Sequence, residues 1–518
     1  MEEQKKKSFF DKFIDGVEKA GNTLPTPFML FIYLCIFVLL LSFVLNKMGV
    51  SVEYTSAAKD GAELETKMVE VVNLLSKKEL ATTLSSFVET FIGFPPLGVV
   101  LVMMMGISFI ENTGLITTFM RRTLQGAPSY MITILIAFIG VNSNIASDAG
   151  VIFSATMGAS LFYSLNRNPY VGATLGFAAA SGGFAANLCI AGTDVLISGI
   201  SQSVTEGMGI SSPVHPLINY YFMATATFVI TVAIALVAEK YLLPKHDFQL
   251  SDNANEENYE LSDLEKKGLR NAFFALMVFI VAVLILVVPK NGMLRAEDGA
   301  ILPKSPFISS IVPLLFIGFV FIGFIYGKTI GVIKSEKDVM NLLKKGVDGS
   351  LTFLVITIPS ALFIDMFNRS KITTVLAVKG AEILEKLNLG TIPLLLVFIL
   401  LVTLVNILMT SGSSKWLILA PIFIPMLAYL GLSPAATQVA FRIGDSATNI
   451  ISPLNSSVAV VLGIMENYRR KTDPEIGIGT VISYTLPYSL AILTSLVILI
   501  IVWVLLGLPL GPGAGIHI

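Results

Sequence analysis

The sequence predicts an all-α polytopic membrane protein: nine transmembrane helices plus two re-entrant helical hairpins in an inverted-topology repeat. Composition gives the first indication, because 54% of the 518 residues are hydrophobic, only 14% are charged and the mean hydropathy is +0.78. A soluble domain carries about 25% charged residues, so lipid must cover much of this surface. The other indications are a series of long apolar stretches and two apolar regions that polar residues interrupt.

Seven apolar stretches are each long enough to cross about 30 Å of hydrocarbon. They cover residues 28–46, 96–118, 216–238, 271–289, 306–327, 349–367 and 478–507. The first follows a basic N-terminus, as a signal peptide would. No small-residue cleavage site follows it, so we expect a retained first helix.

Two further regions, about 128–208 and 391–464, are apolar but contain Gly, Pro, Ser, Asn and Asp. Unsatisfied backbone groups in lipid cost several kcal/mol, so such interruptions require surrounding protein or a cavity. We interpret each region as a hairpin that enters and leaves on one side, followed by a broken spanning helix. With the seven stretches, this gives nine crossings and two hairpins.

The distribution of cations predicts the topology, with the N-terminus inside and the C-terminus outside. Of the 35 Lys and Arg residues, this arrangement places 21 inside and 12 outside, and leaves Lys415 and Arg442 in the membrane. Four cations between Arg369 and Lys386 go against the rule, and we assign them to an interfacial amphipathic helix. Its apolar side carries Val375, Leu376, Ile383 and Leu384.

The topology divides the chain into scaffold and core segments. Residues 1–27 form a cytoplasmic segment, 28–125 the first scaffold helices with an outside loop at 49–90, and 126–208 the first half of a core. Residues 209–390 form further scaffold helices with a cytoplasmic linker at 244–268, 391–508 the second half of the core, and 509–518 a tail. We expect one short helix in 49–90, and neither polar segment carries a catalytic motif.

The two interrupted regions resemble each other. Each opens with a small polar tip, Ser143 to Gly150 or Ser411 to Ser414, and continues through an apolar run to a proline turn. Each then enters a small-residue helix that breaks at Asn187 or Asn449. The first hairpin opens inward and the second outward, which is typical of an inverted repeat with its site at the midplane. Chance similarity of two Gly/Ser-rich segments is the alternative.

Polar side chains at membrane depth are costly, so each is a candidate functional residue. Asp148, with Asn142, Ser143 and Asn144 nearby, offers oxygen ligands for a hard cation such as Na⁺. Gly412 and Ser413 of the second tip are a similar candidate site. No other metal and no cofactor is expected, because the three His residues are scattered and no CxxC spacing is present.

Asp194 follows a Gly-Thr break, where helix ends present unpaired carbonyls. We interpret it as a cation or proton site, together with Asn187 and Asn449 at the breaks. An ion pair with Arg442 is the alternative.

The second region carries the candidate substrate residues. Arg442 and Asp445 lie three residues apart on one helical face. A deep Arg either pairs with a carboxylate or binds an anionic substrate group. Trp416, beside the second tip, is a candidate to stack on an aromatic ligand, although packing within the hairpin also explains it. Asn406 is an isolated amide on an apolar helix, and Pro434 marks the turn into the broken helix.

The motifs that are absent exclude several functions. No Walker A, kinase, GxSxG or HExxH motif occurs, so an enzyme is not expected and transport would use a Na⁺ or H⁺ gradient. The net charge is −1 and no large basic patch is present, so nucleic acid is not an expected partner.

At these residues the sequence resembles the p-aminobenzoyl-glutamate transporter (AbgT) family. SGSSKW, GLSP and FRIGDSATNIISPL are similar to the second half of the family, and SNIASDAGVI and AGTDVLIS to its first half. The resemblance implies a homodimer in the bacterial cytoplasmic (inner) membrane that moves p-aminobenzoyl-glutamate or related aryl carboxylates, or exports sulfonamide antimetabolites. The pathway positions that it implies are Asp194, Asn406, Trp416, Pro434, Arg442 and Asp445.

Three alternatives stay open. A transporter of small dicarboxylates could use the same architecture. Trp416 distinguishes it from a transporter of aryl solutes, because an aliphatic diacid has no ring to stack on the indole. A channel or structural membrane protein would show no saturable, gradient-dependent flux. A lipid-modifying enzyme would turn over a bound compound. The residues do not distinguish uptake from efflux.

Overall fold

The computed structural model describes residues 25–57, 64–124, 128, 131–143, 147–245, 261–301, 305–386, 389–469 and 476–518. Within these ranges, nine helices are long and apolar enough to cross a membrane. They are α2 (Pro27–Lys47), α5 (Pro95–Asn112), α11 (Tyr220–Val237) with its continuation to Lys245, α13 (Asp263–Val287), α15 (Ile311–Ile330), the Ser350–Arg369 part of α16 (Glu336–Arg369), α18 (Thr391–Leu408), α19 (Gly412–Tyr429) and α22 (Ile478–Leu505).

The nine candidate helices agree in number with the predicted spans, but two members of the set differ. Seven of the nine helices overlap the seven predicted apolar stretches. The other two, α18 and α19, are the arms of the predicted second hairpin. The two predicted broken helices instead consist of shorter pieces, because each helix stops at its break. These pieces are α9 (Pro169–Gly182) and α10 (Gly192–Gly207) in the first region, and α20 (Pro434–Thr448) and α21 (Ser456–Glu466) in the second.

The remaining elements complete the fold. They are α3 (Lys77–Ser85), α4 (Phe87–Ile92), α6 (Leu115–Leu124), α7 (Ile132–Asn142), α8 (Ser147–Ser164), α12 (Leu243–Lys245), α14 (Pro306–Ser309), α17 (Ile372–Lys386), the 3₁₀ turn η3 (Gly183–Ala185) and the π-turn η4 (Ala238–Leu242). The strands β1 (Ser51–Ala57) and β2 (Leu64–Glu70) pair antiparallel, with Ser51 opposite Glu70. The fold is helical as predicted, but segment 49–90 contains β1, β2, α3 and α4 where the sequence predicted one short helix.

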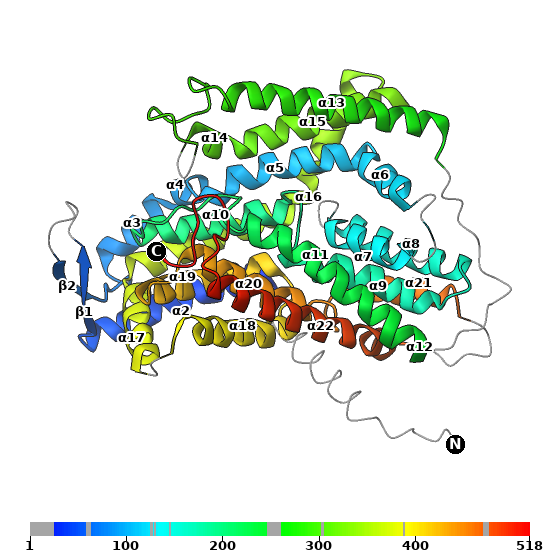
Figure 1. The fold of residues 1–518 in the computed structure, drawn as a ribbon. Helices are drawn as coiled ribbons and strands as arrows, with labels where there is room; N and C mark the ends of the chain where they lie inside the picture. Colours follow the sequence, from blue (N-terminus) through cyan, green and yellow to red (C-terminus); the bar gives the residue numbers. More distant parts are fainter. Residues whose placement is uncertain are drawn as a thin grey trace, which may run out of the picture.

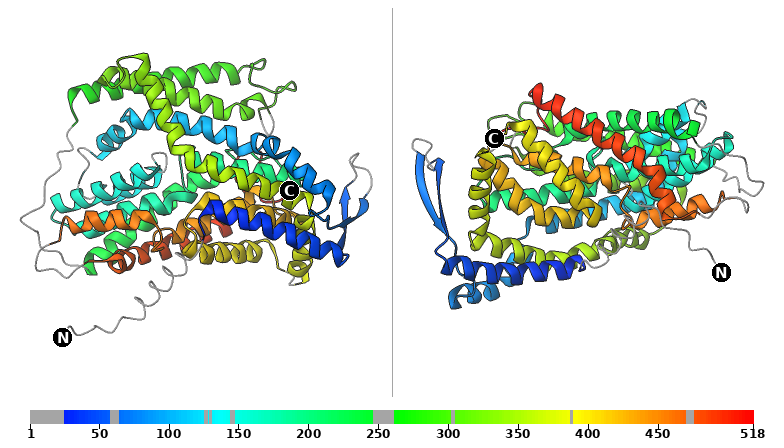
Figure 2. Two further views of the ribbon diagram at one scale, coloured as in Figure 1. Left: turned by 180° about the vertical axis from the view of Figure 1, so that it is seen from behind. Right: turned by 90° about the horizontal axis from the view of Figure 1, so that it is seen from below.

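The helices form a core and an outer layer. Figures 1 and 2 show α13 and α15 side by side as a layer that packs on α5, and α16 crossing obliquely from this layer to α2. The pieces α7 to α10 and α18 to α21 lie beneath this layer together with α11 and α22. The predicted interfacial helix corresponds to α17, which lies across the ends of the other helices (Figure 1).

Both broken helices begin in the same way. Asn168 caps α9 by accepting the N–H of Tyr170 at 2.9 Å, and Pro169 opens the helix. Ser433 caps α20 by accepting the N–H of Ala436 at 3.1 Å, and Pro434 opens that helix. A proline in the first turn loses no hydrogen bond, because its N–H would be unpaired there. The proline turns of the two regions are thus equivalent locally.

Close contact between α8 and α9 depends on glycine. A Cβ added to Gly176 would lie 2.0 Å from the carbonyl oxygen of Ser154, and one added to Gly172 would lie 2.1 Å from that of Gly158. The two backbones therefore touch directly. Small residues at such an interface allow helices to associate in lipid by van der Waals packing.

We expect Gly176→Ala to lower the free energy of unfolding by about 1–3 kcal/mol, because α8 and α9 must separate to admit the methyl group. The measurement is the melting temperature in detergent, followed by size-exclusion chromatography of heated samples. Gly463→Ala is the matched control, since its Cβ meets nothing within 4 Å and the helical Gly→Ala change is favourable. Equal melting temperatures for the two variants would contradict the close packing of α8 on α9.

Candidate functional site

Two ion pairs are buried at the centre of the core. Nη1 of Arg442 on α20 lies 2.8 Å from Oδ1 of Asp194 on α10. Nζ of Lys415 on α19 pairs with Oδ1 of Asp445 on α20. All four side chains are at most 3% exposed. Because an unpaired charge in the interior is very costly, each of these groups depends on its partner.

Local structure holds the first pair in place. Asp194 lies in the first turn of α10, and its Oδ2 accepts the N–H of Ala191 at 2.7 Å. The helix end beside Asp194 therefore presents N–H groups, and the expectation of unpaired carbonyls there was wrong. The carbonyl that takes part belongs to Phe184 at the preceding break, and it accepts Nη1 of Arg442 at 3.1 Å.

The second pair belongs to an amide network. Nζ of Lys415 also donates to Oδ1 of Asn406 on α18. The Asn406 amide in turn donates to the carbonyl oxygen of Asp445 at 2.7 Å and to Oγ1 of Thr448 at 2.9 Å. Nδ2 of Asn449 donates to Oδ2 of Asp445 at 2.9 Å. Asn406 is thus a fully buried partner of the ion pair.

A cavity of about 480 Å³ adjoins both pairs. It lies between the second tip, the two breaks, α5 and α16, and its lining includes Phe184, Thr193, Ser350, Ser411, Asn449 and Asn455. Phe184 and Asn449 line the cavity and also contact an ion pair each. Nε of Arg442 and Oδ1 of Asn449 are buried without a hydrogen-bond partner among the described residues. The site therefore has unused donor and acceptor capacity.

Trp416 lies next to this site rather than at the cavity wall. Its side chain is fully buried, its ring centroid is 4.5 Å from that of Phe441, and its Nε1 donates to Oγ of Ser201 at 3.0 Å. Phe441 in turn meets Phe184 edge-on, with 6.4 Å between ring centroids. An aromatic row of Trp416, Phe441 and Phe184 thus leads to the cavity, and stacking of a ligand on Trp416 itself stays a prediction.

The other candidate ion ligands are dispersed. Oδ1 of Asn187 is buried without a partner among the described residues. Oδ1 of Asn142 accepts the N–H of Leu188 at 3.1 Å, and Ser143 donates to the carbonyl of Gly140 at 2.6 Å. Asn144 and the side chain of Asp148 lie outside the described residues. Across the described ranges, no group of three or more His, Cys, Asp or Glu residues could hold a metal ion.

The second tip adjoins the ion pairs. A Cβ added to Gly412 would lie 3.1 Å from the ring of Phe184 and 3.5 Å from Oδ2 of Asp445. Ser411 caps α19 by accepting the N–H of Ser414. Oγ of Ser413 lies 3.5 Å from Oγ of Ser411. This end of α19 thus reaches the site through backbone and small side chains, which allows the close approach.

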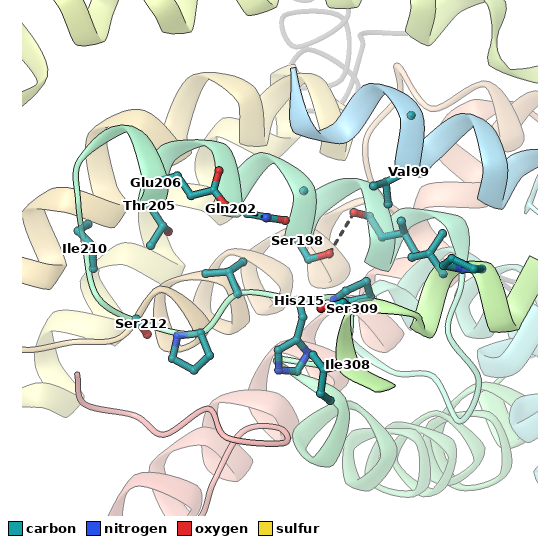
Figure 3. Close-up of a pocket in the computed structure, with 18 of the residues that line it drawn as sticks. Val99, Ser198, Gln202, Thr205, Glu206, Ile210, Ser212, His215, Ile308 and Ser309 are labelled. Atoms are coloured by element: carbon teal, nitrogen blue, oxygen red, sulfur yellow. Dashed lines mark hydrogen bonds between the residues drawn. The ribbon is translucent and has the colours of Figure 1, made fainter. Parts of the chain in front are cut away.

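A second cavity of about 960 Å³ lies along the later turns of α10. Figure 3 shows Ser198, Gln202 and Glu206 on this helix, with His215, Ile308 and Ser309 across the space. Burial lowers the pKa of His215, and its Nδ1 accepts the N–H of Leu217 at 3.2 Å. Its Nε2 therefore donates to the carbonyl of Pro512 at 2.9 Å and ties the C-terminal segment to this loop.

Sequence reasoning missed four residues of the site. Lys415 was recognised as a deep cation but received no role, although its spacing from Asn406 is short enough to suggest contact. Phe184, Ser201 and Gln438, whose Oε1 accepts the Ser201 hydroxyl at 2.6 Å, carried no signal, because an aromatic or uncharged polar residue in an apolar helix is common. Their roles depend on contacts between segments more than 200 residues apart.

A helical bundle with paired charges and a polar cavity between broken helices is typical of membrane transport proteins. The sequence matches the AbgT putative transporter family over residues 12–518, and the chain belongs to this family. It is 34% identical over 502 residues to the p-aminobenzoyl-glutamate transport protein of Escherichia coli K12, covering 97% of this chain and 96% of the relative.

Two solved structures share the fold. The YdaH transporter of Alcanivorax borkumensis is 33% identical, with a TM-score of 0.86 over 94% of this chain and 100% of that chain. MtrF of Neisseria gonorrhoeae, described as illuminating a class of antimetabolite efflux pumps, is 36% identical, with a TM-score of 0.90 over 97% and 100%. The chain is therefore a multi-pass membrane transporter, as its sequence predicted.

Removing one partner of the first ion pair should destabilise the protein more than removing both partners. We expect Arg442→Met to lower the free energy of unfolding by about 3–5 kcal/mol, because Asp194 is left buried and unpaired. The double variant Asp194→Leu with Arg442→Met should recover most of this loss. Thermal unfolding in detergent measures both.

Lys266→Met is the control for charge removal. Lys266 pairs with Asp263 at the surface, where an ion pair contributes about 0–1 kcal/mol. A double variant as unstable as the sum of its two single variants would show that Arg442 and Asp194 are not coupled.

Proposed function

We propose that this protein is a secondary transporter, driven by a Na⁺ or H⁺ gradient, that moves p-aminobenzoyl-glutamate or a related aryl carboxylate. The observation that carries the proposal is the pair of buried cations, Arg442 and Lys415, beside a polar cavity. Each is held by a carboxylate of the protein itself. An incoming carboxylate can therefore replace Asp194 or Asp445 as the partner of the cation, and the displaced carboxylate would then take up a proton or a coupled cation.

The number of charges suits a solute with two carboxylates. Arg442 offers a planar fork that binds a carboxylate in bidentate fashion, and its Nε has no partner among the described residues. Lys415 on α19 offers a compact ammonium. Its partner Asp445 lies three residues after Arg442 on the same side of α20, so the two cations are close together. A single anionic group would use one cation, whereas the glutamate end of the proposed solute would use both.

The aromatic row suits the aryl group. Phe184 lines the cavity, and the Arg442 guanidinium lies 5.4 Å from its ring centroid. An aryl amide in the cavity would therefore have an aromatic wall next to the cation that binds its carboxylate. The name of the Escherichia coli relative supports the same solute.

Ion coupling has candidate ligands at both breaks. Oδ1 of Asn187 and Oδ1 of Asn449 are buried acceptors without partners among the described residues, as a Na⁺ site before binding would present. Asp194 is the candidate for proton coupling, because it would be released when a substrate takes its place on Arg442. Asp148 stays a candidate on its position in the sequence alone.

The orientation and assembly belong to the same proposal. Arg121, Lys240, Lys266 and Arg270 lie where α6 and η4 end and α13 begins, which favours placing this end in the bacterial cytoplasm (Figure 1). The end with β1, β2 and the C-terminus would then face outward. We also propose that α7–α8 and α18–α19 are re-entrant hairpins of an inverted repeat, and that the protein is a homodimer.

The direction of transport has one specific indication. The MtrF structure is described in terms of antimetabolite efflux pumps, so export of sulfonamide-type antimetabolites is the second candidate function. Transport of small dicarboxylates is the rival, and it would use the two cations but not Phe184.

Flux into proteoliposomes tests the proposal. We expect radiolabelled p-aminobenzoyl-glutamate to accumulate above its equilibrium level when either a Na⁺ or an H⁺ gradient is imposed, because transport is coupled to one of them. The double variant Asp194→Leu with Arg442→Met is the matched control and should show no accumulation. Absence of flux in the folded wild-type protein under every gradient would contradict the proposal, and flux of glutarate alone would favour the dicarboxylate rival.

Substitution at Phe184 tests the aromatic wall. We expect Phe184→Leu to raise KM for p-aminobenzoyl-glutamate about tenfold, the equivalent of about 1.4 kcal/mol, through loss of the aryl contact. Inhibition by N-acetylglutamate, which has no aryl group, should change less than twofold. Phe353→Leu alters another phenylalanine of the cavity and is the control. Equal losses for both solutes would show that Phe184 does not recognise the aryl group.

A further inference from the structure

A buried chain of hydrogen bonds leads away from Trp416. Its Nε1 donates to Oγ of Ser201 at 3.0 Å, and Ser201 donates to Oε1 of Gln438 at 2.6 Å. Nε2 of Gln438 donates to Oδ1 of Asn219 at 2.7 Å, and Nδ2 of Asn219 donates to the carbonyl of Ala435 at 2.9 Å. We call this chain the relay. Its four side chains are at most 2% exposed.

The two amides and the indole of the relay each have a fixed orientation. A backbone carbonyl only accepts, so Asn219 must direct its NH₂ group to Ala435 and its oxygen to Gln438. Gln438 must then direct its NH₂ group to Asn219 and its oxygen to Ser201. The hydroxyl of Ser201 has one proton and two acceptors within reach, Oε1 of Gln438 at 2.6 Å and the carbonyl of Ile197 at 3.0 Å, and the amide oxygen is the nearer. Its lone pairs accept the indole N–H, which can only donate. Reversing one member would leave a buried polar group unsatisfied.

The relay connects the same two helices as the first ion pair. Ser201 lies seven residues after Asp194 on α10, and Arg442 lies four residues after Gln438 on α20, so each pair of side chains shares one helical face. The indole of Trp416 is thus held from α10, α20 and Asn219 before α11. Movement of Trp416 alone would break its bond to Ser201, and the amides of Gln438 and Asn219 behind Ser201 cannot rotate to compensate.

The position of Trp416 sets the position of the aromatic row. The Trp416 and Phe441 rings lie at 34° to each other, and Phe441 meets Phe184 at 77°. A change in the indole would therefore pass through Phe441 to the ring that lines the cavity. Neither Ser201 nor Gln438 lines that cavity.

We propose that Ser201 and Gln438 are positioning residues that fix the indole of Trp416 and, through the aromatic row, set the affinity of the cavity for an aryl solute. This inference rests on the proposed function for its solute. The geometry of the relay does not depend on it.

The first experiment is spectroscopic and needs no solute. The chain has two tryptophans, so Trp503→Phe leaves Trp416 as the only tryptophan, and excitation at the red edge of the indole band avoids the tyrosines. In this background Ser201→Ala should move the emission maximum to shorter wavelength, because the indole N–H loses its polar partner. Ser201→Thr keeps the hydroxyl and should show the parental emission. Identical spectra for Ser201→Ala and its parent would overturn the proposal.

The second experiment is a double-mutant cycle measured by transport. Ser201→Ala should raise KM for p-aminobenzoyl-glutamate about fivefold with maximal flux unchanged within about twofold, as expected for one lost hydrogen bond of about 1 kcal/mol. Gln438→Met should act similarly, and Ser201→Thr should restore KM. Trp416→Phe has no indole N–H, so adding Ser201→Ala to it should change KM less than about twofold.

The outcomes separate the inference from the function on which it rests. An equal rise in KM from Ser201→Ala in the Trp416 and Trp416→Phe backgrounds would overturn the inference, because Ser201 would then act without the indole. An emission shift with an unchanged KM would also overturn it. Wild-type protein without flux would instead contradict the proposed function, and the emission spectra would still decide whether the relay holds Trp416.

Discussion

The pairing of four buried charges is the constraint on which the rest of the core depends. Two cations and two carboxylates lie at the centre of a bundle that lipid surrounds, and each would be prohibitively costly alone. Their pairing requires α10, α19 and α20 to approach closely at one level. The small residues of the region, Gly412 above all, make this approach possible.

The helix breaks and the charges depend on each other. A continuous helix satisfies its own backbone groups, whereas a break leaves N–H and C=O groups without partners. Here Asp194 accepts an N–H at the start of α10, and Arg442 donates to the carbonyl of Phe184 at the end of the preceding turn. The ion pair thus provides hydrogen-bond partners for backbone groups at the break, and the break in turn places the two side chains in contact. Removing either would leave the other uncompensated.

The sequence predicts what depends on local composition and fails where distant segments meet. Seven spans, the proline turns and the deep charged residues follow from hydropathy and from the cost of polar groups in lipid. The partner of Lys415, the burial of Trp416 and the role of Ser201 do not, because each is decided by packing between helices far apart in the chain. The strands β1 and β2 were missed because their alternation of polar and apolar residues is weak. Asp194 was assigned to a helix C-terminus although it lies at the N-terminus of α10, because the break has one end of each kind.

A transport site that is occupied only part of the time must be stable when empty. The two ion pairs meet this requirement, since the protein's own carboxylates neutralise Arg442 and Lys415 in the absence of a solute. The affinity for an anionic solute is then a difference between two pairings rather than the full attraction of a buried cation. Under the proposed function, such a difference can be small, which allows release, while recognition of the solute is left to neutral contacts such as Phe184. The charges would then admit a class of anions, and the aromatic row, held by the relay, would select among them.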